Sequence, residues 1–193
     1  MMKTAGRAIA LTVAAVTALT LSGCAGSVSV QSQAPPKPVG TKTGHLSRQH
    51  KAALPRIGTV YKITGVGANN ATITVKLTRV IDPAQGADQF TQPDAGKRFV
   101  AAVFRIKGVL GTASDDANGD VTLVGSNGQD YQFDSSDITG YTNFNYGEFT
   151  VSPGQHGVGA VVFQVPDRVK VAQVQWSGSG GFGGTPATWA VHK

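Results

Sequence analysis

The chain has 193 residues, a single cysteine and a formal net charge of +6, which excludes a fold held together by internal disulfide bonds. The positive charge is concentrated in the N-terminal part of the chain. Residues 1–81 contain ten Lys or Arg and no Asp or Glu, whereas residues 57–193 contain ten basic and eleven acidic side chains. The folded part is therefore close to neutral. It lacks the basic footprint of a nucleic-acid-binding domain, so we expect no nucleic acid as a partner.

Residues 1–23 have the three parts of a secretory signal peptide. Two basic side chains precede an apolar run over residues 8–21, and Ser22 and Gly23 are the small residues that a signal peptidase requires. The run is shorter than the ~20 residues that a membrane-spanning helix needs. We therefore predict that this segment directs export and is then removed.

The apolar run ends in Leu21-Ser22-Gly23-Cys24, which resembles the bacterial lipobox. The resemblance implies that the Cys24 thiol becomes a thioether to diacylglycerol and that cleavage leaves Cys24 as the first residue. Two acyl chains give stable anchoring, at about 0.8 kcal/mol for each buried CH₂. The alternative is a soluble exported protein with an incidental thiol, which is unusual in an oxidising compartment. We predict lipid attachment at Cys24, with the membrane as partner, on the extracytoplasmic face of the cell membrane.

Residues 24–56 are predicted to form a disordered tether. They include Pro35-Pro36-Lys37-Pro38 and few large apolar side chains, a composition that cannot bury enough surface to fold. A loose coil of this length reaches roughly 30 Å. Its basic residues could rest on anionic headgroups at about 1 kcal/mol each, and a merely solvated spacer is the alternative.

Residues 57–193 predict one all-β domain, an immunoglobulin-like antiparallel β-sandwich, with a barrel as the structural alternative. Residues 72–80 alternate apolar and polar side chains until the pattern slips at Arg79-Val80, which predicts a bulge or the end of the strand. Residues 98–106 and 158–165 are apolar on both faces, as central strands are. The eight expected strands are 57–63, 72–80, 98–106, 121–124, 131–133, 158–165, 169–176 and 188–191.

Turn signals separate these strands. Asn127-Gly128 predicts a hairpin between residues 121–124 and 131–133. Residues 82–96, with two prolines, and residues 115–119, with Asn118-Gly119, are predicted to be loops.

Three motifs carry a resemblance to a known family. They are residues 96–103 (GKRFVAAV), residues 127–131 (NGQDY), and the turn Ser152-Pro153-Gly154 leading to residues 159–166 (GAVVFQVP). Over about residues 57–176 the chain resembles the telokin-like, immunoprotective-antigen-like domains of unknown function in exported bacterial proteins. The resemblance implies an immunoglobulin-like sandwich outside the cytoplasm and supplies no catalytic residues. Residues 108–120 depart from the family pattern, in which a short Asn-containing turn is usual.

The segment Asp115–Asp120 (DDANGD) is one candidate site. Oxygen ligands at the alternate positions Asp116, Asn118 and Asp120 could wrap a calcium ion. The spacing falls short of an EF-hand, because Val121 and Asn127 stand where Gly and the bidentate Glu belong. A plain solvated turn is the alternative, and we predict no metal and no cofactor.

The second candidate is an aromatic segment that contains Tyr141, Phe144, Tyr146 and Phe149, with Asn143 and Asn145 between them. Exposed aromatic rings beside amides could contact a protein or a carbohydrate. The alternative is that these rings fill the core or cover its end.

No enzyme is predicted. The domain contains only His156 and His192, neither in a nucleophile elbow, and Cys24 is committed to lipid, so no nucleophile has a base beside it. The leading hypothesis is a lipid-anchored, non-catalytic binding module at the cell surface with an unknown ligand, partnered by the membrane and another envelope or extracellular protein. The alternatives are a structural envelope lipoprotein without a ligand and a calcium-dependent module.

Overall fold

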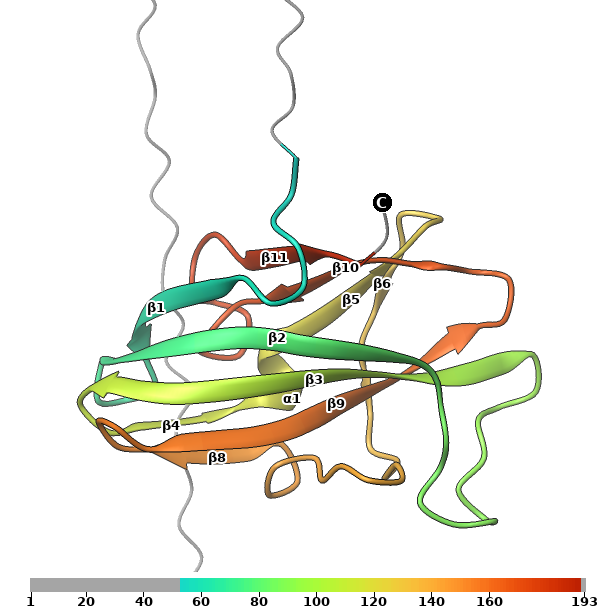
Figure 1. The fold of residues 1–193 in the computed structure, drawn as a ribbon, viewed down its shortest axis with the longest axis horizontal. Coiled ribbons are helices and arrows are strands. Elements are labelled where there is room, and N and C mark those ends of the chain that lie inside the picture. Colours follow the sequence, from blue (N-terminus) through green and yellow to red (C-terminus); the bar gives the residue numbers. More distant parts are fainter. Residues whose placement is uncertain (1–52, 192–193) are drawn as a thin grey trace, which may run out of the picture. The chain divides into compact units, whose positions relative to one another are not determined.

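The computed structural model describes residues 53–191. The predicted signal peptide, Cys24, His192 and most of the predicted tether lie outside this range. The described chain contains strands and one helical turn, α1 (Ala117–Asp120) (Figure 1). No helix in this part is long and apolar enough to cross a bilayer. The strands are β1 (Val60–Val66), β2 (Ala71–Ala84), β3 (Lys97–Leu110), β4 (Ala113–Asp116), β5 (Val121–Gly125), β6 (Asp130–Tyr131), β7 (Phe133–Asp134), β8 (Glu148–Val151), β9 (His156–Pro166), β10 (Val171–Trp176) and β11 (Ala187–Ala190).

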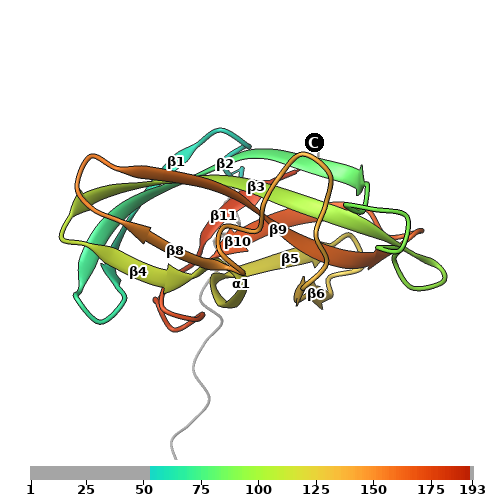
Figure 2. The ribbon, with the colours of Figure 1, turned by 90° about the horizontal axis from the view of Figure 1, so that it is seen from below.

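The strands form a sandwich of two main sheets. One sheet has the order β1-β2-β3-β9-β7 and the other has the order β11-β10-β5-β6, while β4 and β8 pair separately. Every pair of these neighbouring strands is antiparallel. Figure 2 shows the layers from the side, with β2 and β3 at the top and β4 and β5 at the bottom. The predicted antiparallel β-sandwich is therefore confirmed.

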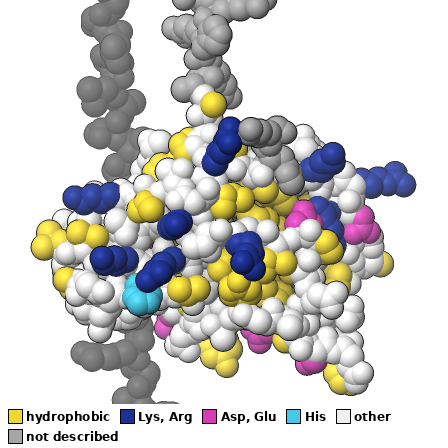
Figure 3. All heavy atoms as spheres, in the orientation of Figure 1, with side chains coloured by type: hydrophobic (Ala, Val, Ile, Leu, Met, Phe, Trp, Pro, Cys, Tyr) yellow, Lys and Arg dark blue, Asp and Glu magenta, His cyan; other side chains and the backbone are white. Residues whose placement is uncertain are grey.

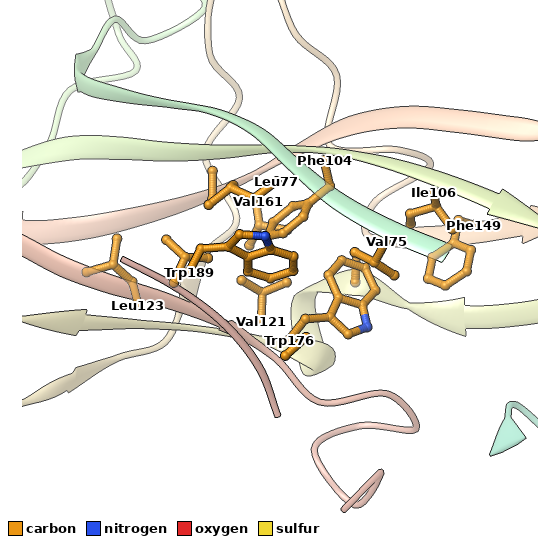
Figure 4. Close-up of a cluster of buried hydrophobic side chains, with 14 of the residues drawn as sticks. Val75, Leu77, Phe104, Ile106, Val121, Leu123, Phe149, Val161, Trp176 and Trp189 are labelled. Atoms are coloured by element: carbon orange, nitrogen blue, oxygen red, sulfur yellow. The ribbon is translucent and has the colours of Figure 1, made fainter. Parts of the chain in front are cut away.

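An aromatic core fills the space between the sheets (Figure 4). Phe104 of β3, Trp176 of β10 and Trp189 of β11 are fully or almost fully buried. The Phe104 ring lies edge-on to both indoles, with centroids 4.9 Å from Trp176 and 5.9 Å from Trp189. Trp189 Nε1 donates a hydrogen bond to the Thr59 carbonyl at 2.9 Å. Because each large aromatic side chain buries about 150–250 Å², packing alone can hold this fold together.

The five-stranded sheet also carries a second apolar cluster on its outer face. Phe99, Ala101 and Val103 of β3 are buried there, together with Ile138 from the segment between β7 and β8. This explains why β3 is apolar on both faces: one face packs in the main core, and the other packs against the segment that contains Ile138. The prediction of residues 98–106 and 158–165 as central strands is confirmed, because β3 lies between β2 and β9, and β9 between β3 and β7.

The register of the sheets confirms two local predictions. The pairing of β2 with β3 shifts between Leu77 and Arg79, where the alternation slips. β5 pairs with β6 across Asn127-Gly128, and Gly128 has the positive φ of +75° that such a turn requires.

The predicted strand over residues 131–133 proves to be two. Tyr131 pairs with Leu123 of β5, whereas Phe133 pairs with Phe163 of β9. The chain therefore crosses from one sheet to the other within three residues, and this crossing places Phe133 at the edge of the sandwich.

Both loop predictions need correction. β2 continues to Ala84, which is buried in the outer cluster and pairs with Phe99, so the loop begins after residue 84 rather than at 82. Residues 115–119 are not a loop, because β4 runs to Asp116 and α1 follows. Asp116 Oδ1 accepts a hydrogen bond from the Asn118 backbone N–H at 2.8 Å and caps this helical turn. Asp and Asn favour both turns and helix N-caps, so composition did not separate the two.

Candidate binding site

A hollow of about 470 Å³ lies where α1, β7 and the segment between β7 and β8 meet. It unites the two candidate segments, since the DDANGD segment contributes Asp116 at the end of β4 and Asn118 in α1, while the aromatic segment contributes Phe144 and Tyr146. The lining residues are Asp116, Asn118, Phe133, Ser135, Asp137, Thr142, Asn143, Phe144, Asn145 and Tyr146. Acidic and neutral side chains line it without any Lys or Arg, so it suits a ligand without negative charge.

Two aromatic rings at the hollow are open to solvent. Tyr146 is 91% exposed and Phe133 is 43% exposed. Large apolar side chains that remain exposed beside polar groups are typical of contact sites. Phe133 was not among the predicted site residues, because its position depends on the crossing between the sheets and leaves no local pattern.

Phe144, by contrast, is an anchor. It is packed against the main core, and its ring lies 6.0 Å from that of Phe149. Gly159 of β9 makes room for it, because a Cβ at that position would lie 2.6 Å from the Phe144 ring. Filling the core was the alternative weighed for this residue, and the structure supports it in part, since Phe144 both packs inward and lines the hollow.

Tyr141 does not line the hollow. It is half-buried and packs against the outer apolar cluster of the five-stranded sheet. Next to it, the Thr142 carbonyl accepts a hydrogen bond from the Ala160 N–H at 2.9 Å, which ties the segment to β9. The three predicted aromatic residues thus divide: Tyr141 is structural, Phe144 is an anchor, and Tyr146 projects into solvent.

A tight turn over residues 143–148 presents Tyr146. The Gly147 N–H donates to the Asn143 carbonyl at 2.8 Å, and Asn145 and Glu148 exchange two backbone hydrogen bonds of 3.1 Å each. Tyr146 has a φ of +53° and Phe144 one of +45°, an uncommon conformation for residues other than glycine. Such strain persists only where the surroundings enforce it and is concentrated at functional sites.

Two side-chain amide oxygens at the hollow have no hydrogen-bond partner within residues 53–191. They are Oδ1 of Asn118 and Oδ1 of Asn143, and both atoms are buried. Asn118 is only 6% exposed, and its Nδ2 donates to the Tyr146 carbonyl over a long 3.4 Å. A buried acceptor without a partner costs free energy, so a hydroxyl group that reached either oxygen would gain a hydrogen bond.

The acidic residues around α1 contact the protein's own backbone. Asp120 is 2% exposed, and its Oδ1 accepts the Gly180 N–H at 2.8 Å, while Asp115 Oδ2 accepts the Ser179 N–H at 2.9 Å. Burial, followed by the negative charge of Asp115, raises the pKa of Asp120 to about 8. These carboxylates hold the glycine-rich loop that follows β10.

The residues proposed as calcium ligands do not form a ligand set in the described part of the chain. Asp116 is used as a helix cap, and Asp120 accepts a backbone N–H instead of facing an ion. Within residues 53–191 no group of three or more His, Cys, Asp or Glu side chains is placed to hold a metal ion. His156 is exposed at the start of β9 and does not line the hollow.

Comparison with known proteins gives only resemblances of fold. No family model and no curated protein matches the chain. Among solved structures, the secreted protein MPT63 from Mycobacterium tuberculosis is 14% identical, with a TM-score of 0.48 over 72% of this chain and 96% of that one. The yjhA protein from Bacillus subtilis is 11% identical, with a TM-score of 0.48 over 72% and 100% of the two chains. An uncharacterized β-sandwich protein from Clostridium difficile 630 is 9% identical, with a TM-score of 0.40 over 72% and 95%.

Proposed function

We propose that this protein is a lipid-anchored, non-catalytic binding module on the extracytoplasmic face of the cell membrane. The sequence supports the anchor, through the signal peptide and the lipobox-like motif that ends at Cys24. The β-sandwich supports the module, because such folds present loops on a rigid frame and loops positioned in this way commonly bind.

The ligand that best fits the hollow is a neutral saccharide. A single observation carries this proposal: exposed Phe133 and Tyr146 lie at the same hollow as the unpartnered amide oxygens of Asn118 and Asn143. Sugar hydroxyls donate hydrogen bonds that amide oxygens can accept. The apolar face of a sugar ring can pack against an aromatic ring. The absence of Lys and Arg from this lining disfavours anionic ligands.

Replacing the exposed ring tests this proposal. Tyr146→Ala should reduce binding to the saccharides that the wild-type protein retains on an array of neutral glycans, by tenfold or more, since an aromatic side chain that acts as a binding hot spot contributes about 2 kcal/mol or more. Tyr146→Phe should keep most of the binding. Isothermal titration calorimetry with the retained glycan measures both variants.

Phe182→Ala is the matched control, because Phe182 is a 93% exposed ring that does not line the hollow. It should bind as the wild type does. If the wild-type protein retains no glycan, or if Phe182→Ala weakens binding as much as Tyr146→Ala, the saccharide proposal is wrong. The first of these outcomes favours a structural envelope lipoprotein without a ligand.

A further inference from the structure

The outer face of the five-stranded sheet has two unlike halves. The half around Phe99 and Ala101 is apolar and packs with Ile138 from the segment between β7 and β8. The other half is uncovered, and we call it the basic face. It consists of Lys62, Lys76, Arg79, Arg105, Lys107 and His156. In Figure 3, Lys and Arg side chains and one His lie over the left and centre of this view, whereas other Lys and Arg lie at the top and right and acidic side chains lie on the right and along the lower edge.

Strand register assembles this face from four strands. Lys62 pairs with Thr74, Thr74 with Lys107, and Lys107 with His156, which makes one row across the sheet. The neighbouring row pairs Lys76 with Arg105. Paired residues point to the same face and neighbouring strands are about 4.8 Å apart, so the cations form a closely spaced array on one face.

The charge on the basic face is not neutralised. Residues 53–191 contain ten Lys or Arg, and five of them lie on this face. The ion pairs within this range, Lys97–Asp94 and Arg98–Asp82, involve none of the five. β1, β3 and β9 contain no Asp or Glu, and β2 contains none before Asp82. Like charges directly opposite one another destabilise a sheet, so the folded domain gains nothing from pairing Lys76 with Arg105.

Exposed aliphatic side chains accompany the cations. Val60 pairs with Lys76 and is 55% exposed, and Val158 pairs with Arg105 and is 50% exposed. Leu110, at the end of β3, is 68% exposed. Flat surfaces that combine Lys and Arg with apolar side chains suit the headgroup region of a bilayer, where both kinds of group find a partner. Binding of a single-stranded nucleic acid would require aromatic side chains on which the bases can stack, and the basic face contains none.

We propose that the basic face docks this domain onto an anionic phospholipid bilayer. Charge complementarity supports a lipid surface, since each Lys or Arg near such a surface contributes about 1 kcal/mol. The preceding chain supports it as well: residues 25–56 add five Lys or Arg and no acidic residue, and they lead into β1, which carries Lys62. This docking goes beyond the saccharide proposal, which concerns the hollow beside α1 and β7.

Vesicle binding tests the docking directly. The chain from residue 24 onward, carrying Cys24→Ser, excludes any attached lipid and keeps the fold intact, because both hydrophobic clusters are built from residues 57–191. We expect it to sediment with vesicles of phosphatidylcholine and phosphatidylglycerol but not with pure phosphatidylcholine, and to be released at 500 mM NaCl. Lys62→Gln/Lys107→Gln should lower the partition coefficient roughly 20- to 30-fold.

Arg168→Gln/Lys170→Gln removes the same charge from the exposed turn between β9 and β10 and is the matched control. It should change partitioning by less than about threefold, and both double variants should melt as the parent does. Equal losses in the two double variants would overturn the proposal, because net charge rather than the basic face would then drive binding. Equal sedimentation with neutral and anionic vesicles would also overturn it. Retention on a soluble polyanion under salt that abolishes vesicle binding would reassign the face to an anionic polymer.

Discussion

At the scale of single residues, Asp120 is the most unusual titratable group of the domain. It is buried beneath the glycine-rich loop, and its carboxyl group accepts the Gly180 N–H while facing the charge of Asp115. Burial is the largest cause that raises its pKa, from an ordinary value of 3.8 to about 8. The folded state therefore holds a proton that the unfolded state releases near pH 4.

The sign of the pH dependence follows from this difference. Below pH 4 both states are protonated, and the contribution of Asp120 to stability is fully present. As the pH rises from 4 to 8, only the unfolded state is ionised, so stability falls by up to about 1.4 kcal/mol per pH unit. Above pH 8 both states are ionised and this loss ends.

We predict that Asp120→Asn removes this slope, because an amide keeps the acceptor for the Gly180 N–H without titrating. Urea unfolding at pH 5 and pH 8 measures it: the wild type should lose stability between the two, and Asp120→Asn should lose markedly less. Asp167→Asn, an exposed carboxylate in the turn after β9, should behave as the wild type does. An unchanged slope in Asp120→Asn would show that Asp120 is ionised in the folded protein.

At the scale of the elements, Arg98 joins the ends of three strands. Its Nε and Nη2 atoms donate to the two carboxylate oxygens of Asp82 in β2. Its Nη1 donates to the Pro166 carbonyl at the end of β9 at 2.8 Å, and Nη2 also donates to the Val169 carbonyl at 2.9 Å. The hydrogen bond to Asp82 raises the pKa of Arg98 above its ordinary value. Arg98 therefore fastens β2, β3 and β9 where the sheet ends.

We predict that Arg98→Ala lowers the free energy of unfolding by about 2 kcal/mol, since hydrogen bonds to charged groups are each worth about 1.5–3 kcal/mol. Arg98→Lys should recover only part of this, because an ammonium cannot make the paired contact with a carboxylate. Urea denaturation measures both variants.

Lys97→Ala is the control on the adjacent residue. Its ion pair with Asp94 is exposed, with 41% and 65% of the two side chains accessible, and exposed pairs contribute about 0–1 kcal/mol. If Lys97→Ala costs as much as Arg98→Ala, the paired contacts of Arg98 are not what holds these strands.

At the scale of the whole molecule, the proposed lipid attachment at Cys24 would determine where the domain acts. A chain anchored through Cys24 would hold both the saccharide hollow and the basic face close to the membrane. On the docking proposal the basic face would add about 1 kcal/mol for each Lys or Arg near the surface, whereas two acyl chains would make membrane attachment stable.

We predict that the protein incorporates a labelled fatty acid in its native host and sediments with membranes, and that Cys24→Ala loses the label. In-gel detection of an alkyne-bearing fatty acid measures incorporation. Ser22→Thr, which keeps the cysteine and changes only a neighbouring side chain, should retain the label. Label that persists on Cys24→Ala would rule out this residue as the attachment point.

Local sequence patterns were sufficient to predict most of the fold. Side chains on a strand alternate between two faces, so the order of apolar and polar residues indicates which faces of a strand are buried. The central strands β3 and β9 could therefore be predicted, as could the slip near Arg79 and the Asn127-Gly128 hairpin. The helical turn α1 could not, because the residues that cap a helix are also those that favour turns. The division of residues 131–133 between two sheets also left no local signal.

The sequence by itself determined the all-β architecture and indicated Cys24 as the residue for lipid attachment, since both depend on patterns within a few neighbouring residues. Only the tertiary structure decided that Phe133 and Asn118 lie at one hollow with Tyr146, that Lys62, Lys107 and His156 form one row, and that Asp120 is buried. The physical reason is that sheet register and chain crossing bring together residues far apart in the chain, and packing rather than local preference selects those pairings.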